Sequence, residues 1–276
     1  MRVEVLVSTM SQEDTLLIDL INRMNISSDS LIINQTDHDA NFLIELHDQK
    51  IRVISSKERG LSRSRNVALE NATGDICVIA DDDITYEDRY QEIIQEAYQK
   101  HPSMDIIVFA LPSQNIERSK EYPSTEKRIG YLRSMRVYSY EITFRRSSIA
   151  RASVSFNELF GAGSGKYSCG EENIFLFNCL RKGIKILYVP KQIGVVSHST
   201  STWFKGYDSK FFFDKGAMFY AMSKSMAFPF VIQYLLRKRK LYKGNLGFHE
   251  AIKNMMKGLF DCKNEITKRI ENRQMD

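Results

Sequence analysis

The sequence lacks most of the features that mark a specialised class of protein. Its four cysteines are scattered and form no CxxC pair, which gives no zinc pattern and no disulfide framework and is typical of a reducing compartment. No run of 18 uncharged apolar residues occurs, so we expect no transmembrane helix. The first residues, MRVEVLVSTM, lack the long apolar core of a signal peptide. A cytoplasmic protein is the simplest expectation.

The composition also lacks a strong charge bias. The 276 residues include 39 basic and 34 acidic side chains, and the net charge of +5 is too mild to predict a nucleic-acid partner. Apolar residues make up 43% of the chain and aromatic residues 11%, which is enough for a sizeable core. We therefore expect one large α/β domain, or one such domain with an appendage.

Residues 1–111 alternate between short apolar strands and amphipathic helices. This alternation predicts a mostly parallel sheet, Rossmann-like, with helices on both faces. The expected strands are 3–9, 30–37, 50–56, 75–80 and 104–111, and the expected helices are 14–25, 60–74 and 87–101.

The pattern weakens after residue 112. Residues 136–149 alternate and fit one strand or two, whereas 171–183 predicts a helix that Gly183 ends and 184–190 predicts a strand. From about residue 206 the chain is helical, basic and aromatic. We therefore expect an α/β domain over residues 1–205 and a helical C-terminal extension over 206–276.

Three consecutive aspartates, Asp81 to Asp83, follow directly on the apolar strand over 75–80. Ligands of parallel sheets bind at the carboxyl ends of the strands, where Ser8, Thr9 and Asn34 also lie. Two residues apart in an extended chain, Asp81 and Asp83 point the same way, and a divalent cation such as Mg²⁺ or Mn²⁺ would neutralise them. A solvated turn that caps the next helix is the alternative.

Two segments carry a resemblance to a known family. KERGLSRSRNVALENATGDICVIADDDITY contains a GLSxARNxG-like helix, a TG(D/E) turn and a strand that ends in a DxD motif, and GEENIFLFNCLRKGIKILYVP matches GEDxxLxxRLxxxGxxIxYVP. With the first strand, the match covers roughly residues 1–200. In these segments the chain resembles the inverting, nucleotide-sugar-dependent glycosyltransferases of family 2, and the resemblance implies the GT-A fold.

The resemblance also implies roles for individual residues on the donor side. Asp81 and Asp83 would hold the donor ribose and the metal on its diphosphate, and Asp82 between them would face either way. The metal, Mn²⁺ or Mg²⁺, would stabilise charge on the leaving diphosphate. Arg65 would contact the nucleotide. Ser8, Thr9 and Asn34 would line the base, although the family's DDGSTD loop is replaced here by INQTD.

The acceptor hydroxyl needs a general base, which the family takes from its ED pair. Aligned through Gly183, that position is Glu172, so Glu replaces Asp. Glu171 is the alternative base, and a further alternative is that both residues only favour the helix N-terminus.

Other candidates lie around the second segment. The glycines of FGAGSGKYSCGEEN, Gly163 among them, allow close approach to the donor sugar or the acceptor, or form an ordinary flexible loop. His198 is a candidate third metal ligand or a structural histidine. Trp203, the only tryptophan, either stacks on a sugar ring or packs in the core.

The C-terminal extension admits two interpretations. Residues 216–236 are apolar and aromatic, with Phe228, Phe230 and Tyr234 as interfacial candidates, and Arg237 to Lys240 follow as four basic residues. This pattern is typical of a segment that binds an anionic membrane peripherally, here at the inner face of the cell membrane. A helical bundle that packs on the sheet or forms a homodimer is the alternative, and Pro229 is expected to kink the helix.

Together these features predict a metal-dependent, hexosyltransferase-like enzyme. It would move a sugar from a nucleotide-diphosphate sugar, most simply UDP-linked, to a glycan or lipid-linked acceptor in cell-surface polysaccharide synthesis. Two alternatives are a nucleotidyltransferase, which would need a Gly-rich phosphate loop that STMSQED does not provide, and a non-catalytic sugar-nucleotide or glycan-binding module.

Overall fold

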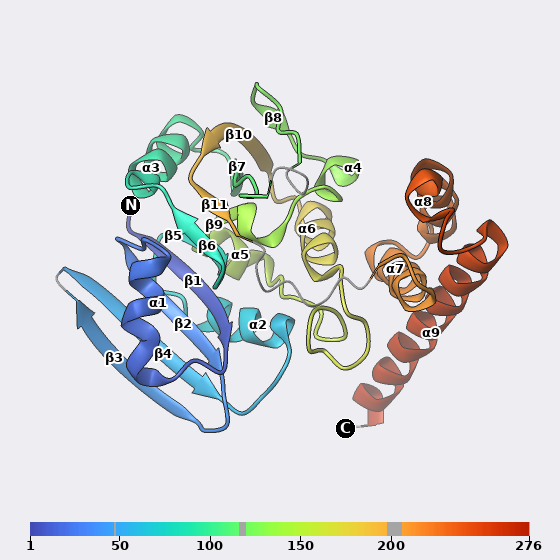
Figure 1. Cartoon of the computed structure of the whole chain (residues 1–276), viewed down its shortest axis with the longest axis horizontal. Helices are drawn as coiled ribbons and strands as arrows, with labels where there is room; N and C mark the ends of the chain where they lie inside the picture. Colours follow the sequence, from blue (N-terminus) through green and yellow to red (C-terminus); the bar gives the residue numbers. More distant parts are fainter. Residues whose placement is uncertain (47, 116–119, 198–205, 276) are drawn as a thin grey trace.

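The computed structural model describes residues 1–46, 48–115, 120–197 and 206–275. Within these residues the chain is organised around a large twisted sheet (Figure 1). The strands of this sheet are β1 (Val3–Met10), β2 (Asp29–Gln35), β3 (Ala40–Leu46), β4 (Gln49–Ser56), β5 (Ile76–Asp81), β7 (Ile106–Ala110), β8 (Lys127–Arg128), β9 (Ile142–Arg145) and β10 (Ile186–Gln192).

The strand order is β3-β4-β2-β1-β5-β9-β7-β10-β8. Strands β4, β2, β1 and β5 are parallel neighbours, as are β7 and β10, whereas β3, β8 and β9 run antiparallel to their partners. The predicted mostly parallel sheet is therefore confirmed. A separate two-stranded sheet pairs β6 (Ile84–Tyr86) with β11 (Gly194–Val196) next to the aspartate run.

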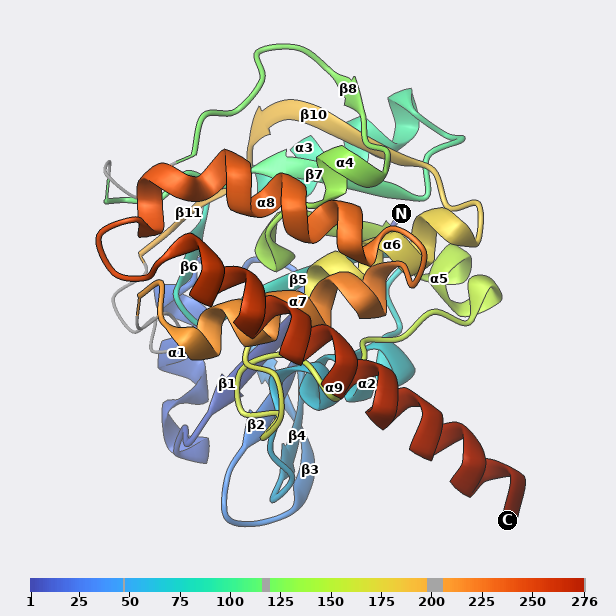
Figure 2. The same cartoon turned by 90° about the vertical axis from the view of Figure 1, so that its right-hand side faces the viewer.

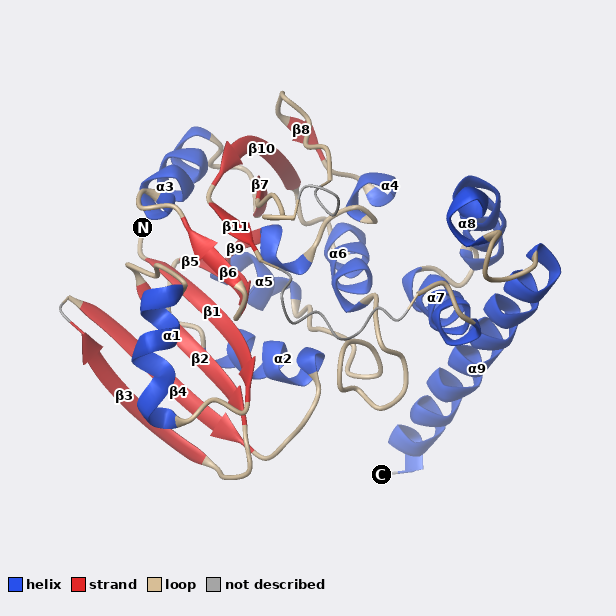
Figure 3. Ribbon diagram, in the orientation of Figure 1, coloured by secondary structure: helices blue, strands red, loops and turns tan. Residues whose placement is uncertain are grey.

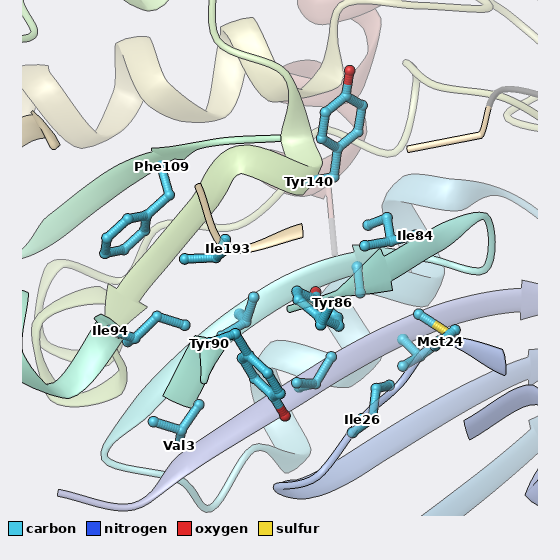
Figure 4. Packing of buried hydrophobic residues seen from close by; sticks show 14 of the residues in the cluster. Val3, Met24, Ile26, Ile84, Tyr86, Tyr90, Ile94, Phe109, Tyr140 and Ile193 are labelled. Atoms are coloured by element: carbon cyan, nitrogen blue, oxygen red, sulfur yellow. The ribbon is translucent and has the colours of Figure 1, made fainter. Parts of the chain in front are cut away.

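Helices cover both faces of the sheet (Figure 3). One hydrophobic cluster joins the sheet to α1 (Leu17–Arg23) and α3 (Tyr90–Lys100), and Figure 4 shows Tyr86 and Tyr90 of this cluster, stacked at 4.6 Å between ring centroids. A second cluster joins the other face to α2 (Leu61–Asn71), α5 (Arg146–Ala152) and α6 (Glu171–Arg181). The short helical segments are η1 (Asp14–Leu16), α4 (Tyr131–Ser134) and η3 (Ser139–Glu141).

Residues 136–149, which were predicted to form one strand or two, form one short strand with a helical segment on either side. Only Ile142–Arg145 is a strand, with η3 before it and α5 after it. The polar members Ser139 and Glu141 are buried, because they bond to Arg65 and Lys120 respectively and do not face solvent. Strand β3 was not predicted; it is an edge strand whose residues are half-buried or exposed.

The C-terminal region forms three helices, α7 (Ser209–Met222), α8 (Ala227–Tyr242) and α9 (Phe248–Met275), stacked beside α6 (Figure 2). Their core is continuous with the α/β domain, since it includes Phe160, Ile174 and Phe177. Helices α7 and α9 cross closely: a Cβ at Gly216 would lie 1.9 Å from the Met255 carbonyl oxygen, and one at Gly258 would lie 1.8 Å from that of Phe213.

Pro229 does not kink a long helix, contrary to the prediction. It lies in the first turn of α8, where a proline removes no intrahelical hydrogen bond. None of the helices in the described ranges is long and apolar enough to span a bilayer.

Candidate active site

The aspartate run forms a tethered turn at the carboxyl end of β5. Asp81 ends the strand opposite Ser8 of β1, and the Thr9 hydroxyl donates to Asp82 Oδ2 at 2.5 Å. The backbone amide of Ser197 donates to the Asp83 carbonyl at 3.0 Å. All three aspartates are half-buried. The turn is thus held from two sides, with its carboxylates at the sheet edge where the sequence predicted a ligand.

Arg65 joins this turn to the start of α6. It is 3% exposed on α2, and its guanidinium donates to Asp81 Oδ1 at 2.8 Å, to Glu171 Oε1 at 3.0 Å and to the Ser139 hydroxyl at 2.8 Å. Both carboxylates keep the pKa of Arg65 above its ordinary value, although burial opposes this. Arg65 therefore connects the predicted donor carboxylate to the predicted ED pair.

The two glutamates of that pair have different surroundings. Glu171 is buried and ion-paired with Arg65, and a Cβ at Gly161 would lie 3.4 Å from its carboxyl carbon. Glu172 is half-buried and has no ion pair among the described residues. Loss of solvent and the negative charge of Glu171 raise the pKa of Glu172 to about 8, against the opposing charges of Lys215 and Arg65. A carboxylate with a pKa near neutrality suits a general base.

Ser8 and Asn34 make internal contacts in the structure. The Ser8 hydroxyl accepts from that of Ser64 on α2 at 2.9 Å. The Asn34 amide is fully buried and bonds to both backbone groups of Gln12, accepting at 3.2 Å and donating at 2.8 Å. Asn34 thus fixes the loop that follows β1, and its contact with a base, like that of Thr9, stays a prediction.

The glycine-rich loop before α6 is tied to its neighbours. The Ala162 carbonyl accepts from the Leu61 amide at 2.9 Å, and Gly163, with φ +72°, packs against Gly60 at the start of α2. A side chain at Gly163 would be strained by this backbone conformation. His198 and Trp203 lie outside the described residues, so their roles stay predictions.

The aspartate turn offers suitable ligands for a divalent cation. Among the residues that the structure describes, no three His, Cys, Asp or Glu side chains are grouped to hold a metal. Mg²⁺ and Mn²⁺ prefer oxygen ligands, and Mg²⁺ is commonly held by one or two carboxylates together with substrate phosphates. The half-buried carboxylates of Asp81 and Asp83 fit that donor set.

Two residues of the site were missed from the sequence. Ser139 lies in a stretch that read as strand, and Lys215 lies in the C-terminal extension, far along the chain from either motif. Neither carries a local signal, because only the fold brings them to Arg65 and Glu172.

Comparisons with known proteins agree with this architecture. Residues 34–160 match the family model described as Glycosyl transferase family 2. The S. aureus TarS 1-349 structure in complex with UDP-GlcNAc aligns with a TM-score of 0.65 at 12% identity, over 95% of this chain and 80% of that one. The Pyrobaculum calidifontis mannosyltransferase PcManGT in complex with GDP-Man and Mn²⁺ aligns with a TM-score of 0.54 at 14% identity, over 95% and 75%. No curated protein sequence matches significantly.

At such identities the structural likeness shows the fold alone, and the similarity to the family is carried by the sequence match over residues 34–160. The segment over residues 34–160 is similar to family 2 glycosyltransferases, and the described residues adopt the GT-A fold. The matched residues include Arg65 and the whole aspartate turn.

Proposed function

We propose that the protein is an inverting glycosyltransferase that uses a UDP-sugar and a glycan or lipid-linked glycan acceptor in cell-surface polysaccharide synthesis. The observation that carries this proposal is the family 2 match, which runs across the aspartate turn. The UDP-GlcNAc complex of the TarS neighbour supports a uridine donor, whereas the mannosyltransferase neighbour was solved with GDP-Man.

In this proposal one side of the site binds the donor and the other side activates the acceptor. Asp81 and Asp83 would hold a divalent cation, which would supply positive charge to stabilise the leaving diphosphate when bound. Glu172 takes the proton of the acceptor hydroxyl as that oxygen attacks the anomeric carbon from the face opposite the diphosphate. Arg65 fixes Asp81 relative to the start of α6, so that the donor carboxylates and the general base keep a constant relative position.

Donor binding is expected to depend on metal and on Asp83. A panel of UDP- and GDP-sugars should raise the Tm of the wild type more with Mn²⁺ than without it. In Asp83→Ala the Mn²⁺-dependent part should disappear while the Tm without ligand changes little, because the side chain lies at a strand tip. Glu96→Ala, an exposed change on α3, is the matched control. An unchanged Mn²⁺-dependent shift in Asp83→Ala would remove this residue from the metal site.

We further propose that α8 attaches the enzyme peripherally to an anionic membrane. The structure changes which side chains of α8 can contact a membrane. Phe230 is buried against Phe177 and Phe219, and Tyr234 is half-buried. The exposed apolar side chains here are Met226, Phe228, Leu236 and Leu241, at 46 to 61%. No Asp or Glu occurs from residue 215 to 249, so α8 and the segments that flank it in the sequence carry no acidic side chain.

The intact protein is expected to sediment with anionic vesicles at low salt and to be released near ~0.5 M salt, since a basic residue near such a surface contributes about 1 kcal/mol and is screened. Serine at Arg237, Lys238, Arg239 and Lys240 should weaken sedimentation without loss of activity on a soluble acceptor. A matched control places serine at four exposed basic residues of the α/β domain, Arg23, Lys50, Lys57 and Lys100. Equal sedimentation of the two variants, or none by the wild type, would reject membrane attachment.

A further inference from the structure

Lys215 of α7 reaches the first turn of α6. Its ammonium lies 3.7 Å from Met218 Sδ, one helical turn further along α7. That sulfur packs on Gly170, where a Cβ would lie 2.5 Å from it, and Gly170 directly precedes Glu171 and Glu172. Gly170 also has φ +95°, so its backbone conformation and this close approach both favour glycine. Because Lys215 contacts Met218 and Met218 packs on Gly170, the cation of α7 lies near the ED pair.

The charge of Lys215 has no close partner in the described part of the chain. Its recorded contacts are the sulfur of Met218 and the ring of Phe211, 5.7 Å from the ring centroid. Lys210, five residues earlier on the same helix, instead forms an ion pair with Asp214 at 2.5 Å. Residues 198–205 contain no Asp or Glu. A half-buried ammonium of this kind needs a negative charge nearby.

Among the acidic groups that the structure describes around Lys215, Glu171 is paired with Arg65 and Asp214 with Lys210, which leaves Glu172 to supply that charge. Within the described residues, the titratable or charged groups that face Glu172 are Glu171 on α6, Arg65 on α2, Tyr138 before η3, Lys215 on α7 and Cys169, whose thiol has a pKa raised by burial and is therefore neutral. Arg65 is already bonded to Glu171 and Asp81. Lys215 is therefore the cation whose charge remains for Glu172.

We propose that Lys215 is a positioning residue of the transfer reaction, which holds the ionised carboxylate of Glu172 at the start of α6 and so makes α7 part of the active site. The proposal rests on Glu172 being the general base. A cation beside a carboxylate favours the ionised form, and a base must be ionised to accept a proton. The C-terminal helices would then contribute to catalysis as well as to packing.

The test compares pH profiles of UDP release from UDP-GlcNAc with Mn²⁺, with water as the acceptor. In Lys215→Met the acidic limb of kcat should move up by about one to two pH units, because one cation at short range has been lost. The rate at pH 7 should fall at least about 10-fold and recover at high pH, with KM little changed. Lys215→Arg should restore the profile, and Lys224→Met, an exposed change in the turn after α7, should leave it unchanged.

The outcomes separate this proposal from the proposed function. A wild type that releases no nucleoside diphosphate from any UDP- or GDP-sugar contradicts the glycosyltransferase assignment. An active wild type whose profile coincides with that of Lys215→Met contradicts only the role of Lys215. Denaturant unfolding at pH 9 gives a test without activity: Lys215→Met should destabilise the wild type more than it destabilises Glu172→Gln. Equal losses in the two backgrounds would show that Lys215 does not interact with Glu172.

Discussion

Replacing Glu172 with Gln is expected to reduce sugar transfer by about 10²–10⁴-fold, the usual contribution of a general base. The amide keeps the shape of the side chain and cannot accept the proton of the acceptor hydroxyl. Affinity for the UDP-sugar, measured by calorimetry with Mn²⁺, should stay close to that of the wild type, because the donor carboxylates lie on the aspartate turn. Near-normal turnover in Glu172→Gln would move the role of base to another residue.

Glu171→Gln is the matched control for the adjacent position. Glu171 is ion-paired with Arg65, so Glu171→Gln should lower the free energy of unfolding. Its effect on kcat should be smaller than that of Glu172→Gln. Glu172→Gln should have the opposite effect on stability. The pKa of Glu172 is raised from 4.5 to about 8, so the folded state keeps a proton that the unfolded chain loses, and stability falls as pH rises through this range. Near pH 8 the Gln variant should therefore be more stable, by up to about 4 kcal/mol.

Replacing Arg65 with Met is expected to lower the free energy of unfolding by about 3–5 kcal/mol and to abolish transfer. The change leaves the buried carboxylate of Glu171 without its cation and removes the link to Asp81, and breaking a buried pair from one side has a cost of this size. Urea unfolding measured by circular dichroism gives the stability, and nucleotide release gives the activity.

The same helix provides a control for Arg65. Arg63 is paired with Glu58 and Glu158 at the surface, where its side chain is 43% exposed, so Arg63→Met should change stability by no more than about 1 kcal/mol. Arg65→Lys keeps the charge but loses the planar guanidinium group. Its free energy of unfolding should lie between those of Arg65→Met and Arg63→Met. If Arg65→Met unfolds at the same urea concentration as Arg63→Met, Arg65 does not hold the site together.

Much of the α/β domain could be predicted because its signals are local. The uninterrupted apolar strand before Asp81 and the helical periodicity over residues 61–71 reflect burial against a sheet, and a single sequence records both. Gly183, with φ +81°, ends α6 as its position predicted. The placement of the aspartates at a strand end followed from the alternation of strands and helices alone.

The remaining features depend on contacts between distant segments. The antiparallel β9 lies between β5 and β7, and nothing in its own residues records that insertion. The three side chains that Arg65 bonds to come from three other elements, so the sequence shows none of these bonds, and its contact with the nucleotide stays a prediction. Phe230 read as interfacial because the helices that bury it lie elsewhere in the chain.

The most direct test of the central claim is ³¹P NMR of the purified protein with Mn²⁺ and each member of a panel of UDP- and GDP-sugars. The proposed function predicts that at least one sugar nucleotide is converted to its nucleoside diphosphate, with no pyrophosphate formed, and that Glu172→Gln slows this conversion. Release of pyrophosphate from a nucleoside triphosphate and a sugar phosphate would instead identify a nucleotidyltransferase. Binding of a sugar nucleotide without any turnover would identify a non-catalytic module, and either result would contradict the account.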